Sequence, residues 1–353
     1  MQSLPSYIKD SKSFLQQLFH LGPLPSNAFL VTADVKSLYT NIPHQEGIDT
    51  LLKHMEGNPL LLPLDCPPLH VVRQLLQFIL EENCFKFTDK YYRQIHGTAM
   101  GSKCAPPYAS VFMGDFENKI LPLTTAISFW RRFIDDIFFI FCGTEEELLA
   151  LLGKINKLHP KISLTFKYSR ECIEFLDIKI CVDSNGHLYS DLYRKPTDTF
   201  ALLHFTSLHP PSTKSSIIYA QALRYRMLIT RDADLKTALK TLSTHLIYRG
   251  YPKNTITANF SKISKLTQHE ALYRCKTLPG NVTRNQDGKS LTFVVPYSTK
   301  NRKIKEALSK HWHLIESDPA LSKIWQNPPL LANSRHPNLK DILVHTGTPT
   351  PQT

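Results

Sequence analysis

Two adjacent carboxylates, Asp135 and Asp136, lie inside an apolar and aromatic run that spans residues 127–142. Aromatic and β-branched residues flank the pair on both sides, so the run predicts two β-strands that fold back around an acidic tip. Adjacent anions raise the free-energy cost of ionising each other, and aromatic neighbours increase that cost. We therefore expect a cation at the tip, with a divalent metal as the first candidate. A solvated Asp-Asp turn is the alternative that these residues alone leave open.

A third carboxylate, Asp34, ends an apolar segment at residues 28–35 that predicts a buried strand. If this strand neighbours the 127–142 hairpin in one sheet, three carboxylates converge at one end of it. Two Mg²⁺ ions about 3.5–4 Å apart, held by such carboxylates, are the machinery of nucleotidyl transfer. Magnesium keeps several waters and takes few protein oxygens, so a sparse set of aspartates suffices. The sequence contains no Cys/His cluster that competes as a metal site.

The composition is that of a soluble globular protein. The length of 353 residues suggests about two or three domains. Of these residues 42% are hydrophobic, and the mean hydropathy is -0.22. No run approaches the ~20 apolar residues of a membrane helix, and the N-terminus has no secretory signal. The seven cysteines are odd in number and scattered, which argues against a disulfide framework and a zinc ribbon. We expect a reducing, intracellular location, in the nucleus.

Charge is distributed unevenly along the chain. Residues 1–200 contain 20 Lys and Arg against 22 Asp and Glu, a net charge of -2, whereas residues 201–353 contain 22 against 8, a net charge of +14. An acidic metal site beside a surface that binds polyanions has this asymmetry. A generic basic, solvated face explains the second half equally well.

Hydrophobic periodicity, turn residues and caps predict the remaining elements. In the first part we expect helices at 45–54, 69–82, 105–120 and, after a Thr144–Glu147 capping box, up to 158, with strands at 84–87, 91–95, 162–168, 173–182 and 187–193. Beyond about 195 we expect helices at 214–229, 232–247, 254–270, 302–315 and 318–326, one strand at 291–295, and a frayed Pro-rich end.

Several motifs resemble those of reverse transcriptases. The segment Asp34–Pro43 looks like their first catalytic motif, Phe133–Asp136 like their aromatic-x-Asp-Asp motif, and Gln94–Ala109 like the loop and helix that support the template and the incoming base. Further segments are most similar to Penelope-like retroelements: Phe175–Asp177, Leu192–Asp198, Ser207–Pro210, His311–His313 and His336–Val344. The resemblance covers nearly the whole chain.

The resemblance implies roles for individual residues. Asp34 and Asp135 would hold two Mg²⁺ ions with the Val35 carbonyl, and Asp136 would support the site. Tyr39 would be the aromatic gate that excludes a ribose 2′-hydroxyl, and an ordinary core aromatic is its alternative. Further roles near the nucleotide fall to three residues: Gly101 for close backbone approach, Phe133 for packing near the primer end, and Lys167 for protonating the leaving pyrophosphate.

The family places a thumb in the basic half. Lys214, Arg224, Arg226 and Arg231 lie on or beside a predicted helix there, where they would contact the phosphates of a primer–template without reading sequence. A solvated helix face is the alternative for each. The implied partners are an RNA template, a DNA primer and deoxynucleoside triphosphates, with no membrane.

The resemblance implies an α+β fold: a polymerase-type palm, with an antiparallel sheet and packed helices, followed by a basic helical thumb and a connector. We expect the palm with partial fingers at 1–198, the thumb at 199–280, and a connector with a frayed end at 281–353. The fingers motifs and the GIY-YIG endonuclease of Penelope-like elements are not found, so we expect a fragment. An RNA-directed DNA polymerase is the first hypothesis. A catalytically inactive nucleic-acid-binding remnant is the alternative.

Overall fold

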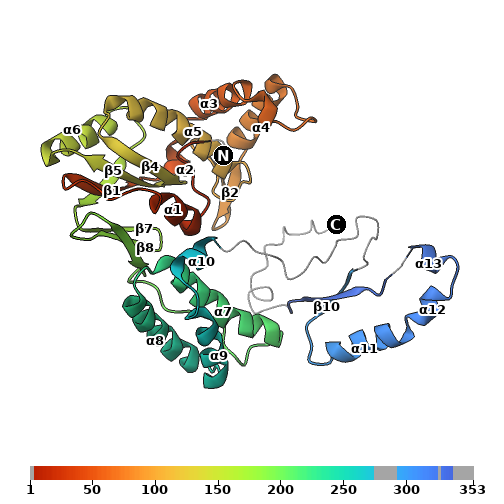
Figure 1. Ribbon diagram of the computed structural model, residues 1–353. Coiled ribbons are helices and arrows are strands. Elements are labelled where there is room, and N and C mark those ends of the chain that lie inside the picture. Colours follow the sequence, from red (N-terminus) through yellow and green to blue (C-terminus); the bar gives the residue numbers. More distant parts are fainter. Residues whose placement is uncertain (1–3, 274–291, 325–326, 337–353) are drawn as a thin grey trace. The chain divides into compact units, whose positions relative to one another are not determined.

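The computed structural model describes residues 4–273, 292–324 and 327–336. The chain divides into two compact units, which are described separately (Figure 1). The first comprises Met1–Asp198 with Met227–Ala238, and the second comprises Thr199–Arg226 with Leu239–Thr353.

The first unit is built on a four-stranded antiparallel sheet with the strand order β4-β5-β1-β6. Its strands are β1 (Ala28–Val35), β4 (Ile127–Phe133), β5 (Asp136–Cys142) and β6 (Leu164–Ser169). The two inner strands are the most apolar because both of their faces are covered: the residues of β5 from Ile137 to Phe141 are all buried. The predicted antiparallel sheet with packed helices is therefore confirmed, including the strand 28–35 and the hairpin around the acidic pair.

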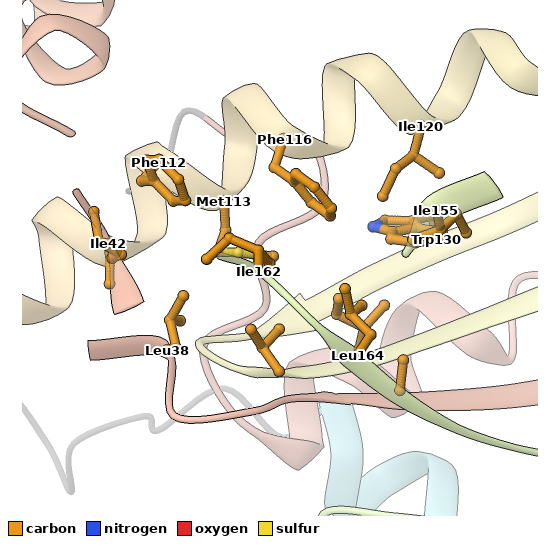
Figure 2. Packing of buried hydrophobic residues seen from close by; sticks show 14 of the residues in the cluster. Leu38, Ile42, Phe112, Met113, Phe116, Ile120, Trp130, Ile155, Ile162 and Leu164 are labelled. Carbon is orange, nitrogen blue, oxygen red and sulfur yellow. The ribbon is translucent and has the colours of Figure 1, made fainter. Parts of the chain in front are cut away.

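Helices cover one face of this sheet. They are α5 (Ala105–Ile120) and α6 (Glu145–Ile155), while α3 (His44–Glu56) packs against α5. Figure 2 shows Phe112, Met113, Phe116 and Ile120 of α5 pointing toward the sheet, at the three- and four-residue spacing of one helical face. Fully burying each such side chain contributes roughly 1.5–3 kcal/mol, so this layer fixes how α5 lies on the strands. The α6 capping box predicted at Thr144 and Glu147 is present.

A helix and a small sheet pack on the other face. The helix α1 (Ser11–Leu18), which the sequence patterns did not predict, places the Phe14 ring 5.1 Å from Phe138 of β5 and 4.8 Å from Phe175. The small sheet is an antiparallel meander of β7 (Cys172–Phe175), β8 (Ile178–Val182) and β9 (Leu188–Leu192).

Two predictions for this meander are wrong. The single strand predicted at 173–182 is a hairpin, because Leu176 adopts a left-handed conformation with φ of 56° and reverses the chain. The scattered cysteines were expected to stay reduced, but Cys172 and Cys181 form a disulfide. The hairpin sets these two residues directly opposite each other, with Cα atoms 4.1 Å apart, a proximity that sequence spacing does not reveal.

Most of the remaining elements of the first unit lie between β1 and α5 in the sequence. They are α2 (Leu38–Asn41), the 3₁₀ turn at Pro59–Leu61, α4 (Leu69–Glu81) and an exposed hairpin of β2 (Cys84–Phe87) and β3 (Lys90–Arg93). A second 3₁₀ turn, at Leu121–Leu123, follows α5. The predicted helix at 69–82 and the hairpin around Asp89 are confirmed.

The second unit begins with helices. They are α7 (Pro211–Leu228), α8 (Asp232–Tyr248), α9 (Lys253–Ile263) and α10 (Gln268–Tyr273). The last two residues of α7 and the part of α8 up to Ala238 belong to the first unit. The single helix predicted at 254–270 is wrong. Thr267 and Glu270 form a reciprocal capping box, and such a cap starts a new helix rather than continuing the previous one.

The last described part pairs β10 (Thr292–Pro296) with β11 (Leu330–Ser334) in parallel. Three short helices lie between them in sequence: α11 (Asn301–His311), α12 (His313–Glu316) and α13 (Leu321–Ile324). The strand predicted at 291–295 is present with a shifted start, whereas β11 was expected to be frayed. Most of the motif at 336–344 lies outside the described residues. None of the described helices is long and apolar enough to cross a membrane.

Candidate active site

Asp34 and Asp136 are direct partners in the pairing of β1 with β5. Opposite residues in antiparallel strands have Cα atoms about 4.5–5.5 Å apart and side chains on the same face. Carboxylates separated by about a hundred residues therefore meet at one end of the sheet. The same face carries Thr165 and Lys167 on β6, which pair with Asp34 and Thr32 of β1.

Asp135 lies in the two-residue turn between β4 and β5. The turn is tight because Ile134 has a left-handed φ of 56°, which costs free energy for a β-branched residue. The backbone N–H of Val35 donates to the carbonyl of Asp135 at 3.2 Å. This hydrogen bond ties the acidic turn to the end of β1, where Asp34 lies.

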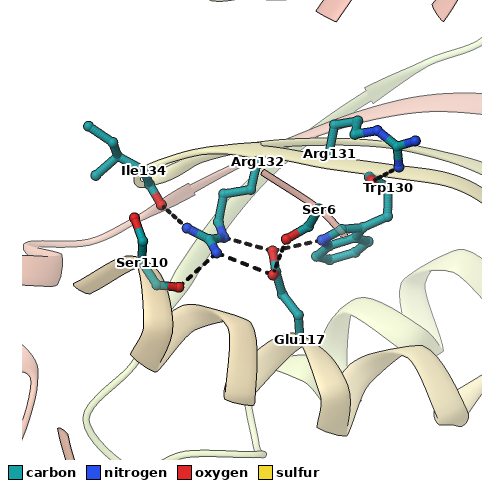
Figure 3. A network of polar contacts seen from close by, with 7 residues as sticks. All are labelled: Ser6, Ser110, Glu117, Trp130, Arg131, Arg132 and Ile134. Carbon is teal, nitrogen blue, oxygen red and sulfur yellow. Dashed lines mark hydrogen bonds and ion pairs between the residues drawn. The ribbon is translucent and has the colours of Figure 1, made fainter. Parts of the chain in front are cut away.

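A buried polar network holds the turn from behind (Figure 3). The guanidinium of Arg132, which is fully buried, donates to the Ile134 carbonyl at 3.0 Å and to the Ser110 carbonyl at 3.0 Å. It also forms an ion pair with Glu117 at 2.8 Å. Glu117 in turn accepts from the Trp130 indole N–H at 2.9 Å and from Ser6. Each side-chain nitrogen of Arg132 and each carboxylate oxygen of Glu117 thus has a hydrogen-bond partner, which buried charges require.

The sequence analysis missed this network, although it carries a signal. Arg132 lies on the buried face of its strand, in register with Ile137, and Glu117 lies between Phe116 and Ile120 on the helix face that packs on the sheet. Opposite charges at positions that must be buried predict an internal ion pair.

The three carboxylates affect one another electrostatically. Burial, followed by the charges of Asp135 and Asp34, raises the pKa of Asp136 to about 6. Burial and the Asp135 charge also raise the pKa of Asp34 above its ordinary value. The Lys195 ammonium acts in the opposite direction on both groups. Sequence reasoning did not single out Lys195 as a site residue.

The donor chemistry at this end of the sheet suits Mg²⁺, since hard carboxylate oxygens gather where their mutual repulsion disfavours ionisation. Across the described ranges, however, no three Asp, Glu, His or Cys side chains are grouped so that together they hold one metal ion. An ion that retains waters and takes substrate phosphates needs only one or two of these carboxylates. The residues therefore fit Mg²⁺ as an open site rather than as a closed one.

Tyr39 is half-buried, and burial and then the Asp135 charge raise its pKa above the usual value. Its carbonyl accepts from the Thr98 N–H at 2.7 Å. Gly97, with φ of 67°, makes this contact possible because a Cβ there would lie 2.3 Å from the same carbonyl oxygen. Gly101, predicted to allow close approach, is exposed and has open space around it. Gly97 is the glycine whose close packing the sequence analysis missed.

Phe133 is half-buried and pairs with Asp136 across the β4–β5 turn. Lys167 is exposed, and it lines a pocket of about 300 Å³ together with Asp34, Asp136 and Lys195. Lys167 therefore lies near the carboxylates, whereas Phe133 lies at the end of the neighbouring strand, β4.

The predicted phosphate-binding residues differ in exposure. Arg224 is exposed, and Lys214 is half-buried with its ammonium 5.2 Å from the centre of the Phe205 ring. Arg231 is exposed and stacks over Tyr189 at 3.7 Å. Arg226 is only 3% exposed. As a phosphate contact Arg226 is therefore a wrong prediction, because an arriving strand cannot reach a guanidinium enclosed by protein.

Two family models match the chain. Residues 3–170 match the model described as "Reverse transcriptase (RNA-dependent DNA polymerase)", and residues 201–261 match the "Animal helix-turn-helix domain". The first match contains Asp34, Asp135 and Asp136, and the second contains α7, α8 and most of α9. No curated protein matches the chain.

Solved polymerase structures resemble the fold. The telomerase of Candida albicans, in complex with a TWJ fragment of telomeric RNA, aligns over 92% of this chain and 55% of its own, with 10% identity and a TM-score of 0.51. The RNA-dependent RNA polymerase of a human picobirnavirus aligns over 73% of this chain and 49% of its own, with 11% identity and a TM-score of 0.44. The chain spans about half the length of the telomerase chains that it matches. Residues 3–170 thus form a reverse-transcriptase-like domain with the fold of a polymerase palm.

Proposed function

We propose that the chain is the RNA-directed DNA polymerase of a Penelope-like retroelement, which adds deoxynucleotides to a DNA primer on an RNA template, inside the cell and in the nucleus. The observation that supports it most strongly is the register of β1 with β5, in which Asp34 is opposite Asp136, inside a segment that matches the reverse transcriptase family. The Penelope-like assignment is supported by the motifs at 175–177, 192–198 and 207–210.

In this proposal Asp34 and Asp135 hold two Mg²⁺ ions with the Val35 carbonyl, while Asp136 supports the site. Bound Mg²⁺ would activate the 3′-hydroxyl of the primer and neutralise charge on the triphosphate. The raised pKa of Asp136 is consistent with an acidic site that requires a cation. The buried Arg132 keeps the turn that carries Asp135 in place through the Ile134 carbonyl.

The remaining assignments concern the nucleotide. Tyr39 would exclude a 2′-hydroxyl by steric contact, Gly101 would leave room for the backbone to approach, and Phe133 would pack near the primer end. Lys167, which shares the pocket with Asp34 and Asp136, would donate a proton to the leaving pyrophosphate.

The basic helices would grip the primer–template. Arg224 and Arg231 are exposed and Lys214 is half-buried, so that each can contact phosphates. Helix-turn-helix units of other proteins bind nucleic acid through their helices, and the match of residues 201–261 to such a family supports this assignment.

Primer extension with the Asp135→Asn variant tests the polymerase. The exchange removes a negative charge from the proposed metal site and keeps the size of the side chain, so we expect incorporation on an RNA template with Mg²⁺ to fall by about 10²–10³-fold. Asp65→Asn is the matched control, since Asp65 is exposed in the segment between α3 and α4. Equal incorporation by wild type and Asp135→Asn would reject the mechanism.

Tyr39→Ala tests the gate. Removing the ring should improve incorporation of ribonucleotides relative to deoxynucleotides by about tenfold or more, because a steric exclusion is lost. Competition between the two nucleotides at one template position measures this ratio. An unchanged ratio removes the assignment of Tyr39.

The second candidate function is a catalytically inactive protein that binds nucleic acid. It is favoured by the net charge of +14 over residues 201–353. It predicts primer–template binding that weakens steeply with salt, no extension, and the same affinity after Asp135→Asn. Affinity that does not change with salt would contradict it.

A further inference from the structure

The pocket beside the carboxylates has a second wall. One wall is the end of the palm sheet, with Asp34, Asp136 and Lys167, and the other is the β7–β9 meander, with Glu174 and, beyond β9, Lys195. The pocket encloses about 300 Å³, which is large enough for one nucleotide unit. Lys195 is the cation of the second wall.

The backbone around Lys195 is anchored on both sides. The N–H of Tyr193 donates to the carbonyl of Asp177 at 3.0 Å, in the turn between β7 and β8. Arg194 forms an ion pair with Asp198 at 2.7 Å. These contacts hold the peptide of Lys195 at the rim, while its exposed four-carbon side chain stays free to reach into the pocket.

The charges around the pocket leave Lys195 available. Glu174, the acid of the same wall, lies directly opposite Lys179 in the β7–β8 pairing. No carboxylate among the described residues lies within ion-pair distance of the Lys195 ammonium. The ammonium nevertheless stabilises the ionised forms of both Asp34 and Asp136, so its charge is directed at the carboxylate end of the sheet.

We infer that Lys195 is a phosphate-binding residue of this pocket, and that the phosphate belongs to the strand whose 3′ end is extended. A polyanion that approaches three aspartates is repelled unless cations accompany it. Lys167 stands on the palm wall, where the proposed function assigns it to the leaving pyrophosphate. Lys195 faces the same carboxylates from the opposite wall, where a primer phosphodiester would lie beside the reacting 3′-hydroxyl. The identity of the strand rests on the proposed function; the phosphate chemistry does not.

Binding of a fluorescent primer–template to the full chain, measured by anisotropy without nucleotide, tests the inference. Lys195→Ala should weaken binding by about tenfold, as expected for the loss of one charge-assisted contact. The slope of log K against log salt should become shallower by about 0.9, because one counterion fewer is released. Lys195→Arg should retain most of the affinity. Lys154→Ala is the control, since Lys154 is exposed on α6, which covers the other face of the sheet.

Nucleotide kinetics separate the two possible sources of phosphate. An unchanged KM for the deoxynucleotide in Lys195→Ala, with weaker primer–template binding, supports the primer. A raised KM with unchanged primer–template binding overturns the assignment to the primer and moves the phosphate to the triphosphate. If neither quantity differs from wild type, Lys195 binds no phosphate.

The Asp135→Asn variant keeps this result independent of the proposed function. The wild-type protein could fail to extend a primer, while Lys195→Ala still weakens primer–template binding. That result would support the phosphate site and reject the polymerase. If Asp135→Asn abolishes extension, while Lys195→Ala changes neither extension nor primer–template binding, the polymerase is supported and the phosphate site at Lys195 is rejected. A wild-type chain that does not bind the primer–template would overturn both.

Discussion

Charged side chains of the β4–β5 hairpin have two opposite environments within a few residues. In β4, Arg132 is fully buried, and its guanidinium is matched by Glu117 and two backbone carbonyls. At the tip, Asp135 and Asp136 lie beside Asp34, and no described basic side chain forms an ion pair with any of the three. The fold pairs the buried charge where the hairpin packs on α5, and it leaves the carboxylates at the open end without an ion pair from the described residues.

This difference separates structural charge from functional charge. A buried ion pair with all of its hydrogen bonds made keeps one arrangement of the chain and breaks at high cost. Like charges held together raise one another's pKa and destabilise the fold, so they persist where a ligand supplies the missing cation. Arg132 also joins the two regions, because the carbonyl it binds belongs to Ile134 in the acidic turn.

The largest expected effect is on the neutralised side. Glu117→Gln leaves the Arg132 charge buried without its partner and should lower the free energy of unfolding by about 3–5 kcal/mol, as measured by urea denaturation. Asp115→Asn on the same helix breaks the more exposed pair with Lys119 and should cost less than about 1 kcal/mol. Similar losses for both variants would contradict the contrast.

At the acidic tip, activity should fall without loss of stability. Asp34→Asn should reduce incorporation by about 10²–10³-fold, while the urea midpoint stays the same or rises, because a repelled charge has been removed. If the variant is inactive and also strongly destabilised, Asp34 has a structural role like that of Arg132.

The smallest effect is a pH dependence at Asp136. Its pKa is about 6 in the folded protein and about 3.9 when unfolded, so the folded state binds more protons between these values, and stability falls as pH rises from 4 to 6. Asp136→Asn removes this loss and should add about 1–2 kcal/mol at pH 7, after allowance for solvent screening, and almost nothing near pH 3.5. Urea denaturation with EDTA at both pH values measures the difference. An equal effect at both would show that Asp136 does not titrate as described.

Much of the first unit was predictable because its signals are local. The apolar run at 28–35, the aromatic residues around Asp135 and the three- and four-residue spacing in α5 each reflect one element and its neighbours in sequence. The capping box at Thr144 is equally local. These patterns predicted three strands and two helices correctly, together with the position of the acidic turn.

Other features depend on partners remote in sequence. The helix α1 exists in the fold because Phe14 packs against Phe138 and Phe175. The chain reverses at Leu176 because this residue adopts a left-handed conformation, which leucine rarely does and which the sequence therefore does not predict. The sequence around Arg226 does not distinguish it from an exposed arginine, and only the packing in the folded chain buries its side chain.

The amino-acid sequence by itself therefore determined which segments become strands and helices and which residues supply the acidic chemistry, because periodicity and propensity act between near neighbours. The tertiary structure alone decided that Asp34 lies opposite Asp136, that Glu117 neutralises Arg132 behind the turn, and that Lys195 shares the carboxylate pocket. Strand register and packing set those relations, and each depends on residues that the chain brings together only when it folds.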